Sequence, residues 1–95
     1  MSVKWRPAAS AEFRTAVGYL KERNPVAACE FSETIARVVS LLDRRPQIAR
    51  PSNYPGFRVW SLPKWHKVIV FREIGENIEI AAVLDTRQVP PRAIE

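Results

Sequence analysis

The stretch HKVIVFREIGENIEIAAVLD, residues 66–85, decides the fold of this chain. Residues 66–73 are rich in β-branched and aromatic side chains, and residues 78–84 begin with alternating apolar and polar positions, so both segments are typical of strands. The intervening Ile74-Gly75-Glu76-Asn77 is typical of a turn. The sequence therefore predicts a β-hairpin. Because its second strand becomes apolar throughout after Glu79, we expect both faces of this hairpin to be at least partly covered.

Two further strands are predicted upstream of the hairpin. Residues 57–62 have a strand composition, and Pro63 closes the segment. At the start of the chain, apolar and basic residues alternate over positions 3–6, which predicts a short first strand that ends at Pro7. The loop before residue 57 contains two prolines and a glycine.

The first of two helices is predicted over residues 11–23. Ser10 is a suitable N-cap, and Glu12 would lie in the first turn, where the helix dipole favours an anion. The apolar residues follow one helical stripe, which makes the helix amphipathic. This stripe contains Phe13, Ala16, Val17 and Leu20.

The second helix is predicted to begin at Asn24-Pro25, because Asn is a good N-cap and Pro is favoured as the first helical residue. Its apolar residues recur at spacings of three and four as far as Asp43, before Pro46 stops the helix. They are Ala28, Phe31, Ile35, Val38 and Leu42. A break this short between two amphipathic helices predicts an αα-hairpin.

The predicted order of elements is β-α-α-β-β-β. It gives an α+β fold class, in which an N-terminal strand and a helical hairpin pack on a small, mainly antiparallel sheet. The chain has 95 residues and a mass of 10.9 kDa, so we expect a single domain over residues 1–95.

The composition is that of a folded soluble protein, with 46% hydrophobic and 26% charged residues. No apolar run reaches the roughly 18 residues that span a bilayer, and no secretory signal is visible. The single cysteine, Cys29, can form neither an internal disulfide nor a cysteine-based zinc cluster. We therefore expect a cytoplasmic protein.

Positive charge is concentrated in one part of the chain. The net charge is +5, yet residues 44–72 contain seven basic residues and no acidic one. Such a block favours an anionic partner, which could be nucleic acid, an acidic protein segment or a membrane surface. A solubilising basic face is the alternative interpretation, and charge alone does not decide between them.

Residues that could carry chemistry are few. His66 is the only histidine, and its predicted position at the start of a strand does not favour a nucleophilic dyad with Cys29 on a distant helix. No carboxylates lie at metal-ligand spacing with a histidine, and the three glycines are isolated. Trp60 and Trp65 are interleaved with basic residues, which suits either core aromatics or a base-stacking platform.

Five segments, taken in this order and spacing, resemble the ParE branch of the RelE/ParE toxins. They are residues 24–28, 42–46, 55–59, 68–72 and 82–87. The resemblance extends from Val3 to about Pro90. It implies the RelE/ParE-like fold, a helical hairpin packed on a small antiparallel sheet, and a place among the toxins of type II toxin–antitoxin modules, which stabilise plasmids.

The resemblance also separates two activities. RelE-type members cleave messenger RNA on the ribosome without a metal, whereas ParE-type members are thought to poison DNA gyrase by binding. Arg58 and Arg87 match basic positions of the family. Val68 stands about where the ribonucleases carry a second arginine, and no Tyr or His follows Arg87. RNA cleavage needs a base as well as cations, so the ParE branch is favoured. Asp85 replaces a histidine that is frequent in the family.

The resemblance implies a toxin that inhibits DNA gyrase by binding and is neutralised by a ParD-like antitoxin. It implies no catalytic residue, no metal, no small-molecule cofactor and no membrane partner. Two alternatives remain: a RelE-like ribosome-dependent mRNA endoribonuclease, and a non-toxic basic nucleic-acid-binding module.

Two sets of residues are assigned to the partners. We expect the target-binding residues to lie near one another; they are Arg58, Lys67, Arg72 and Arg87. We expect apolar residues to bind the antitoxin because so small a sheet would not fully cover both helical stripes. That set is Phe13, Val17, Leu20, Phe31, Ile35, Val38 and Trp60, together with Arg58, which suits an acidic antitoxin tail.

Overall fold

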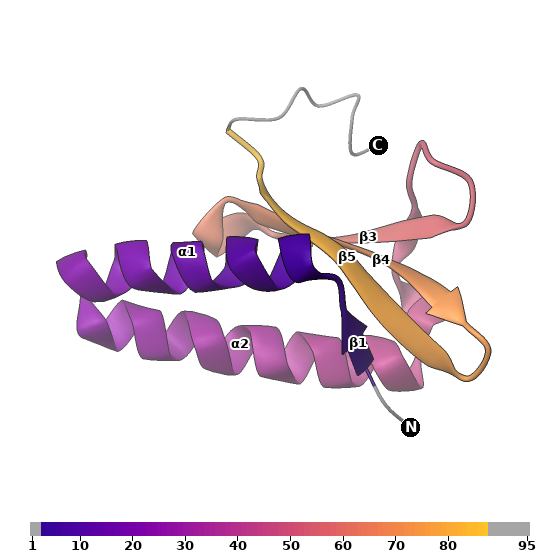
Figure 1. The fold of residues 1–95 in the computed structure, drawn as a ribbon, viewed down its shortest axis with the longest axis horizontal. Coiled ribbons are helices and arrows are strands. Elements are labelled where there is room, and N and C mark those ends of the chain that lie inside the picture. Colours follow the sequence, from indigo (N-terminus) through magenta and orange to yellow (C-terminus); the bar gives the residue numbers. More distant parts are fainter. Residues whose placement is uncertain (1–2, 88–95) are drawn as a thin grey trace.

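The computed structural model describes residues 3–87. Its helices and strands are β1 (Val3–Trp5), α1 (Pro7–Arg23), α2 (Pro25–Arg44), β2 (Arg50–Pro51), β3 (Phe57–Leu62), β4 (Lys67–Ile74) and β5 (Asn77–Asp85). Two short 3-10 turns, η1 (Pro46–Ile48) and η2 (Pro63–Trp65), follow α2 and β3. The two helices lie side by side on one side of the sheet (Figure 1). The α+β prediction is confirmed.

Helix α1 begins four residues earlier than the sequence analysis predicted. Pro7 is its first residue, Arg6 stands at the N-cap without a side-chain cap, and no acidic residue occupies the first turn. The prediction of a Ser10 cap was therefore wrong. Pro7 both ends the strand and starts the helix, because its fixed φ suits the first helical position and its missing N–H is not needed there.

Helix α2 begins as predicted. The side chain of Asn24 accepts a hydrogen bond of 3.1 Å from the backbone N–H of Ala27, and Pro25 is the first helical residue. The Asn24 backbone N–H in turn bonds to the carbonyl of Leu20, at the end of α1. One residue thus closes the first helix and opens the second, which produces the tight αα-hairpin.

The sheet has the strand order β1-β5-β4-β3-β2. All neighbours are antiparallel except β1 and β5, which are parallel. Gly75 turns the β4–β5 hairpin with a φ of +59°, a conformation that costs glycine little. The register slips at Ala81, because Phe71 pairs with Ile80 whereas Val70 pairs with Ala82. This bulge brings Ile80 and Val83, three residues apart, into the same core.

The core lies between the helices and the sheet. Its largest fully buried side chains include Phe31, Leu42, Ile69, Phe71 and Ile80. Trp60 and Trp65 pack against this core, so the structure favours their interpretation as core aromatics. The opposite face of the sheet carries a second, smaller cluster of Val59 and Val68, with Val70 and Leu84 partly buried beside them.

Candidate functional site

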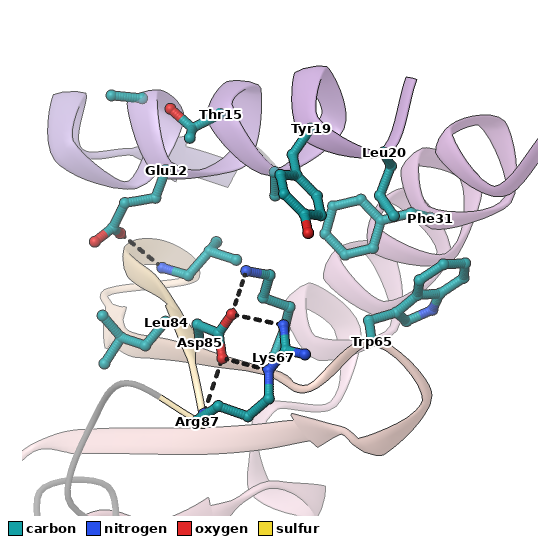
Figure 2. A pocket seen from close by; sticks show the side chains of 13 residues that line it. Glu12, Thr15, Tyr19, Leu20, Phe31, Trp65, Lys67, Leu84, Asp85 and Arg87 are labelled. Carbon is teal, nitrogen blue, oxygen red and sulfur yellow. Dashed lines mark hydrogen bonds and ion pairs between the residues drawn. The ribbon is translucent and has the colours of Figure 1, made fainter. Parts of the chain in front are cut away.

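A groove of about 640 Å³ runs between α1, η2 and β5 (Figure 2). One wall is apolar and aromatic. The ring of Phe31 meets that of Trp65 edge-on, with centroids 5.4 Å apart, and Leu20 lies beside them. Tyr19 is 56% exposed, and the guanidinium of Arg23 stacks 3.7 Å from the centre of its ring. Tyr19 is the exposed ring of this wall, whereas Phe31 is buried and Trp65 is partly buried.

The opposite end of the groove is charged, and its charges pair internally. The carboxylate of Asp85 receives Lys67 Nζ at 3.4 Å and Arg87 Nη2 at 3.1 Å, and the backbone N–H of Arg87 bonds to it at 2.8 Å. Hydrogen bonds from Arg87, reinforced by Lys67, outweigh burial and hold the pKa of Asp85 well below its usual range. Asp85 therefore remains ionised and neutralises much of the charge of both cations.

Glu12 links helix α1 to the edge of the sheet. Strand β1 pairs with β5 only as far as Ile80, so the edge of β5 beyond that point lacks a neighbouring strand among residues 3–87. The carboxylate of Glu12 accepts a hydrogen bond of 2.9 Å from the backbone N–H of Val83 on this edge (Figure 2). The contact ties α1 to β5 beside the groove, which both residues line.

A second cluster lies on the face of the sheet away from the helices. Arg6 and Arg72 each donate from Nε to the same oxygen of Glu79, at 2.9 Å. Their guanidinium carbons lie 5.5 and 5.7 Å from the ring centre of Phe57. Burial raises the pKa of Glu79, but the hydrogen bonds and charges of the two arginines outweigh it and leave that pKa below its ordinary value.

The four predicted target-binding cations do not form one cluster, so that expectation was wrong. Lys67 and Arg87 meet at Asp85, whereas Arg72 lies on the opposite sheet face with Glu79 and Phe57. Arg58 donates to the carbonyl of Ala49 at 2.8 Å and pairs with Glu73. Arg72 is on the other face because side chains alternate along a strand. Arg58 lies opposite Phe71, which is four positions along β4 from Lys67, so these two cations are separated along the strands.

The cations of residues 44–72 are also less available to a partner than the sequence indicated. Four of its seven cations pair with carboxylates that lie outside residues 44–72. These pairs are Arg58–Glu73, Lys64–Glu30, Lys67–Asp85 and Arg72–Glu79. The positive block of the sequence is therefore distributed over separate ion pairs.

The predicted antitoxin-binding residues differ in accessibility. Phe31 and Ile35 are 0% and 2% exposed, because the sheet covers the second helical stripe more fully than we expected. The partly buried members pack against the same core; they are Phe13, Val17, Leu20, Val38 and Trp60. Of the set, Leu20 and Phe31 line the groove.

Neither a metal site nor a membrane span is found within residues 3–87. No three His, Cys, Asp or Glu residues of this part lie together as a metal ion would require. None of the helices there is both long and apolar enough to cross a membrane. Cys29 is exposed on α2, and His66, also exposed, has a left-handed φ of 54° at the end of η2.

Comparison with known proteins shows the family of this chain. Residues 3–90 match the family model described as the ParE toxin of the type II toxin–antitoxin system parDE. The chain belongs to the ParE toxin family. A solved structure described as the chromosomal ParDE toxin–antitoxin system from P. aeruginosa is 28% identical to it, with a TM-score of 0.75. The alignment covers 87% of this chain and 92% of that one.

No match is found among curated proteins. The family membership and the ParDE likeness confirm the predicted ParE-type resemblance and RelE/ParE-like fold. They also place this member of the ParE family in the type II toxin–antitoxin class. Sequence reasoning did not single out Arg6, Tyr19 and Glu79.

Proposed function

We propose that this chain is a toxin that inhibits DNA gyrase by binding and is neutralised by a ParD-like antitoxin in the cytoplasm. The match to the ParE toxin family over residues 3–90 carries this proposal. The likeness to the ParDE system of P. aeruginosa over 87% of the chain supports an antitoxin of the ParD type.

The chemistry of the groove supports binding rather than catalysis. Metal-free RNA cleavage needs a base to activate the 2′-hydroxyl and cations that are free to meet the phosphate. Lys67 and Arg87 are both engaged by Asp85. Glu12, the other carboxylate of the groove, already accepts the N–H of Val83. His66, the only histidine of the chain, is not among the groove residues.

The groove is the surface that we assign to the target. It combines an aromatic wall, of which Tyr19 is exposed, with charged groups at one end, and partner-binding sites are enriched in such exposed aromatic anchors. Tyr19 is the most accessible large side chain of this wall, at 56% exposure. Lys67 and Arg87 remain proposed target contacts at the charged end.

A growth experiment tests this function. Expression of the unaltered chain in a bacterial host should arrest growth and induce a DNA-damage response while bulk messenger RNA stays intact. Tyr19→Ala should relieve the arrest. With no antitoxin expressed, Tyr54→Ala is the matched control, because Tyr54 is similarly exposed at 58% but lies outside the groove, beside the other sheet face. Rapid messenger cleavage at ribosomes that Arg58→Ala abolishes would assign the chain to the ribonuclease branch instead.

A further inference from the structure

The sheet face away from the helices combines positive charge with an apolar hollow. The hollow has a volume of about 240 Å³, and its floor is formed by aliphatic side chains that include Val59, Val70 and Leu84. Ser52, Tyr54 and Phe57, which are joined by backbone hydrogen bonds, complete its lining together with Arg6. Its size and lining suit one aliphatic side chain of a partner.

Three arginines share this face. Arg6 lines the hollow, Arg72 meets Arg6 at Glu79, and Arg50 is directly opposite Val59 in the register of β2 and β3. Directly opposed residues of antiparallel strands project to the same side of a sheet. The only carboxylate that meets them within residues 3–87 is Glu79, so this face carries a positive excess.

Glu79 occupies only part of the hydrogen-bonding capacity of the two arginines that it holds. Arg6 and Arg72 each donate to it from Nε. No terminal guanidinium nitrogen of either arginine bonds to another residue of the described chain. Their side chains are 39% and 42% exposed, so a second carboxylate can reach these nitrogens from solvent.

We propose that this face is a docking site for an acidic segment of the antitoxin, which places a carboxylate on Arg6 and Arg72 and an adjacent aliphatic side chain in the hollow. The inference rests on the proposed function, because it takes the antitoxin as the partner. Glu79 then acts as an internal competitor for the incoming carboxylate, and Arg50 attracts the segment from the opposite edge of the sheet.

A protein segment fits this face better than a nucleic acid does. Base stacking requires an aromatic ring with a free face. Here the guanidinium groups of both arginines lie 5.5 and 5.7 Å from the centre of the Phe57 ring, and the floor of the hollow is aliphatic, so Tyr54 at its border is the one exposed ring of the lining. An aliphatic pocket next to paired arginines is complementary to neighbouring apolar and acidic residues of a peptide.

The test is a titration of the purified full-length antitoxin against the full toxin chain at low and high salt. Arg72→Gln should weaken binding about tenfold at low salt, and less when the charges are screened. Arg50→Gln should weaken binding about threefold, because it removes long-range attraction only. Arg50 has an exposed side chain, so this variant preserves the fold. Arg14→Gln is the matched control, since it removes the same charge from the exposed side of α1 and should change nothing.

Glu79→Gln is the most discriminating variant, because its expected effect on antitoxin binding is opposite to that of Arg72→Gln. Removal of the competing carboxylate should strengthen antitoxin binding about threefold at low salt. A merely structural role of the cluster predicts weaker binding for both Glu79→Gln and Arg72→Gln. Binding that is unchanged or weaker in Glu79→Gln would therefore overturn the proposal.

The other possible occupants give different outcomes. If Arg72→Gln reduces binding to a DNA duplex but not to the antitoxin, the face belongs to nucleic acid and the proposal fails. If the free toxin is a dimer that Arg72→Gln dissociates without affecting the antitoxin, a second copy is the occupant and the proposal also fails. An unaltered chain that neither arrests growth nor binds antitoxin overturns the proposed function itself. Variants that bind like an active, unaltered chain overturn this inference alone.

Discussion

Glu12 on α1 accepts a hydrogen bond of 2.9 Å from the backbone N–H of Val83 on β5, which is 71 positions away in the sequence. The bond satisfies a strand-edge donor that β1 is too short to reach. It also holds α1 against the strand that forms the opposite wall of the groove. A single carboxylate therefore joins the helical hairpin to the sheet at the candidate target surface.

Loss of this acceptor should destabilise the fold. Glu12→Ala leaves the Val83 N–H without its partner, and an unsatisfied, partly buried donor costs about 1–3 kcal/mol. Glu12→Gln keeps an acceptor oxygen and should cost less than half as much. Urea unfolding of both variants checks this expectation. Equal stability of Glu12→Ala and the unaltered chain would show that water accepts the hydrogen bond of the Val83 N–H equally well.

Asp85→Asn should lower stability at neutral pH, because an amide cannot balance both Lys67 and Arg87. We expect a loss of about 1 kcal/mol, or roughly 5 °C in melting temperature, since Arg87 is largely exposed to solvent. Glu22→Gln removes a carboxylate that is 83% exposed and should have no measurable effect.

The stability difference between the unaltered chain and Asp85→Asn should depend on pH in one direction. The pKa of Asp85 in the folded chain lies below its ordinary value of 3.8. Its contribution is therefore complete above about pH 4 and declines as the pH falls further, where the unfolded chain takes up the proton first. The stability difference between the unaltered chain and Asp85→Asn should shrink below this pH. A difference that stays constant down to about pH 2.5 would contradict the ion-pair account.

The second helical stripe should behave as core. Ile35 is 2% exposed, so Ile35→Ala should cost about 2–5 kcal/mol in unfolding free energy. Val26 on the same helix is 67% exposed, and Val26→Ala should cost less than about 0.5 kcal/mol. Denaturant titration of the two variants measures the contrast. Similar stabilities would mean that Ile35 is available to a partner, as the sequence analysis expected.

The antitoxin should stabilise the folded toxin strongly. A ligand that binds only the folded form at about 100 times its dissociation constant adds about 2.7 kcal/mol. For a domain of this size, that corresponds to an increase in melting temperature of roughly 10–20 °C. Thermal denaturation with and without the antitoxin measures the increase. A melting temperature that does not change at a saturating concentration of antitoxin would contradict the proposed partnership.

Local sequence signals predicted most of the elements but not the contacts between them. Asn24-Pro25 defined the helical break because a cap and an N1 proline act within one turn. Pro7 was misassigned because the same residue suits both a strand end and a helix start. The Ala81 bulge was hidden because it shifts the apolar alternation of β5 without any glycine or proline to mark it.

The ion pairs of the two charge clusters depend on strand register, which the sequence predicts only in part. Counting back from the turn at Gly75-Glu76 places Arg72 opposite Glu79, so this pair was within reach of the sequence. The approach of Arg6 to the same carboxylate could not be predicted from the sequence, because it depends on the parallel pairing of β1 with β5. Likewise, the meeting of Lys67 and Arg87 at Asp85 requires the end of β5 to lie beside the start of β4.

We propose that this member of the ParE family acts by binding gyrase through the groove. The most direct measurement is the supercoiling of relaxed plasmid by purified gyrase with increasing amounts of the purified toxin. We predict inhibition or trapped cleaved DNA, which antitoxin reverses and which Tyr19→Ala reduces by about tenfold. Uninhibited supercoiling by a folded chain that still arrests growth would contradict the claim.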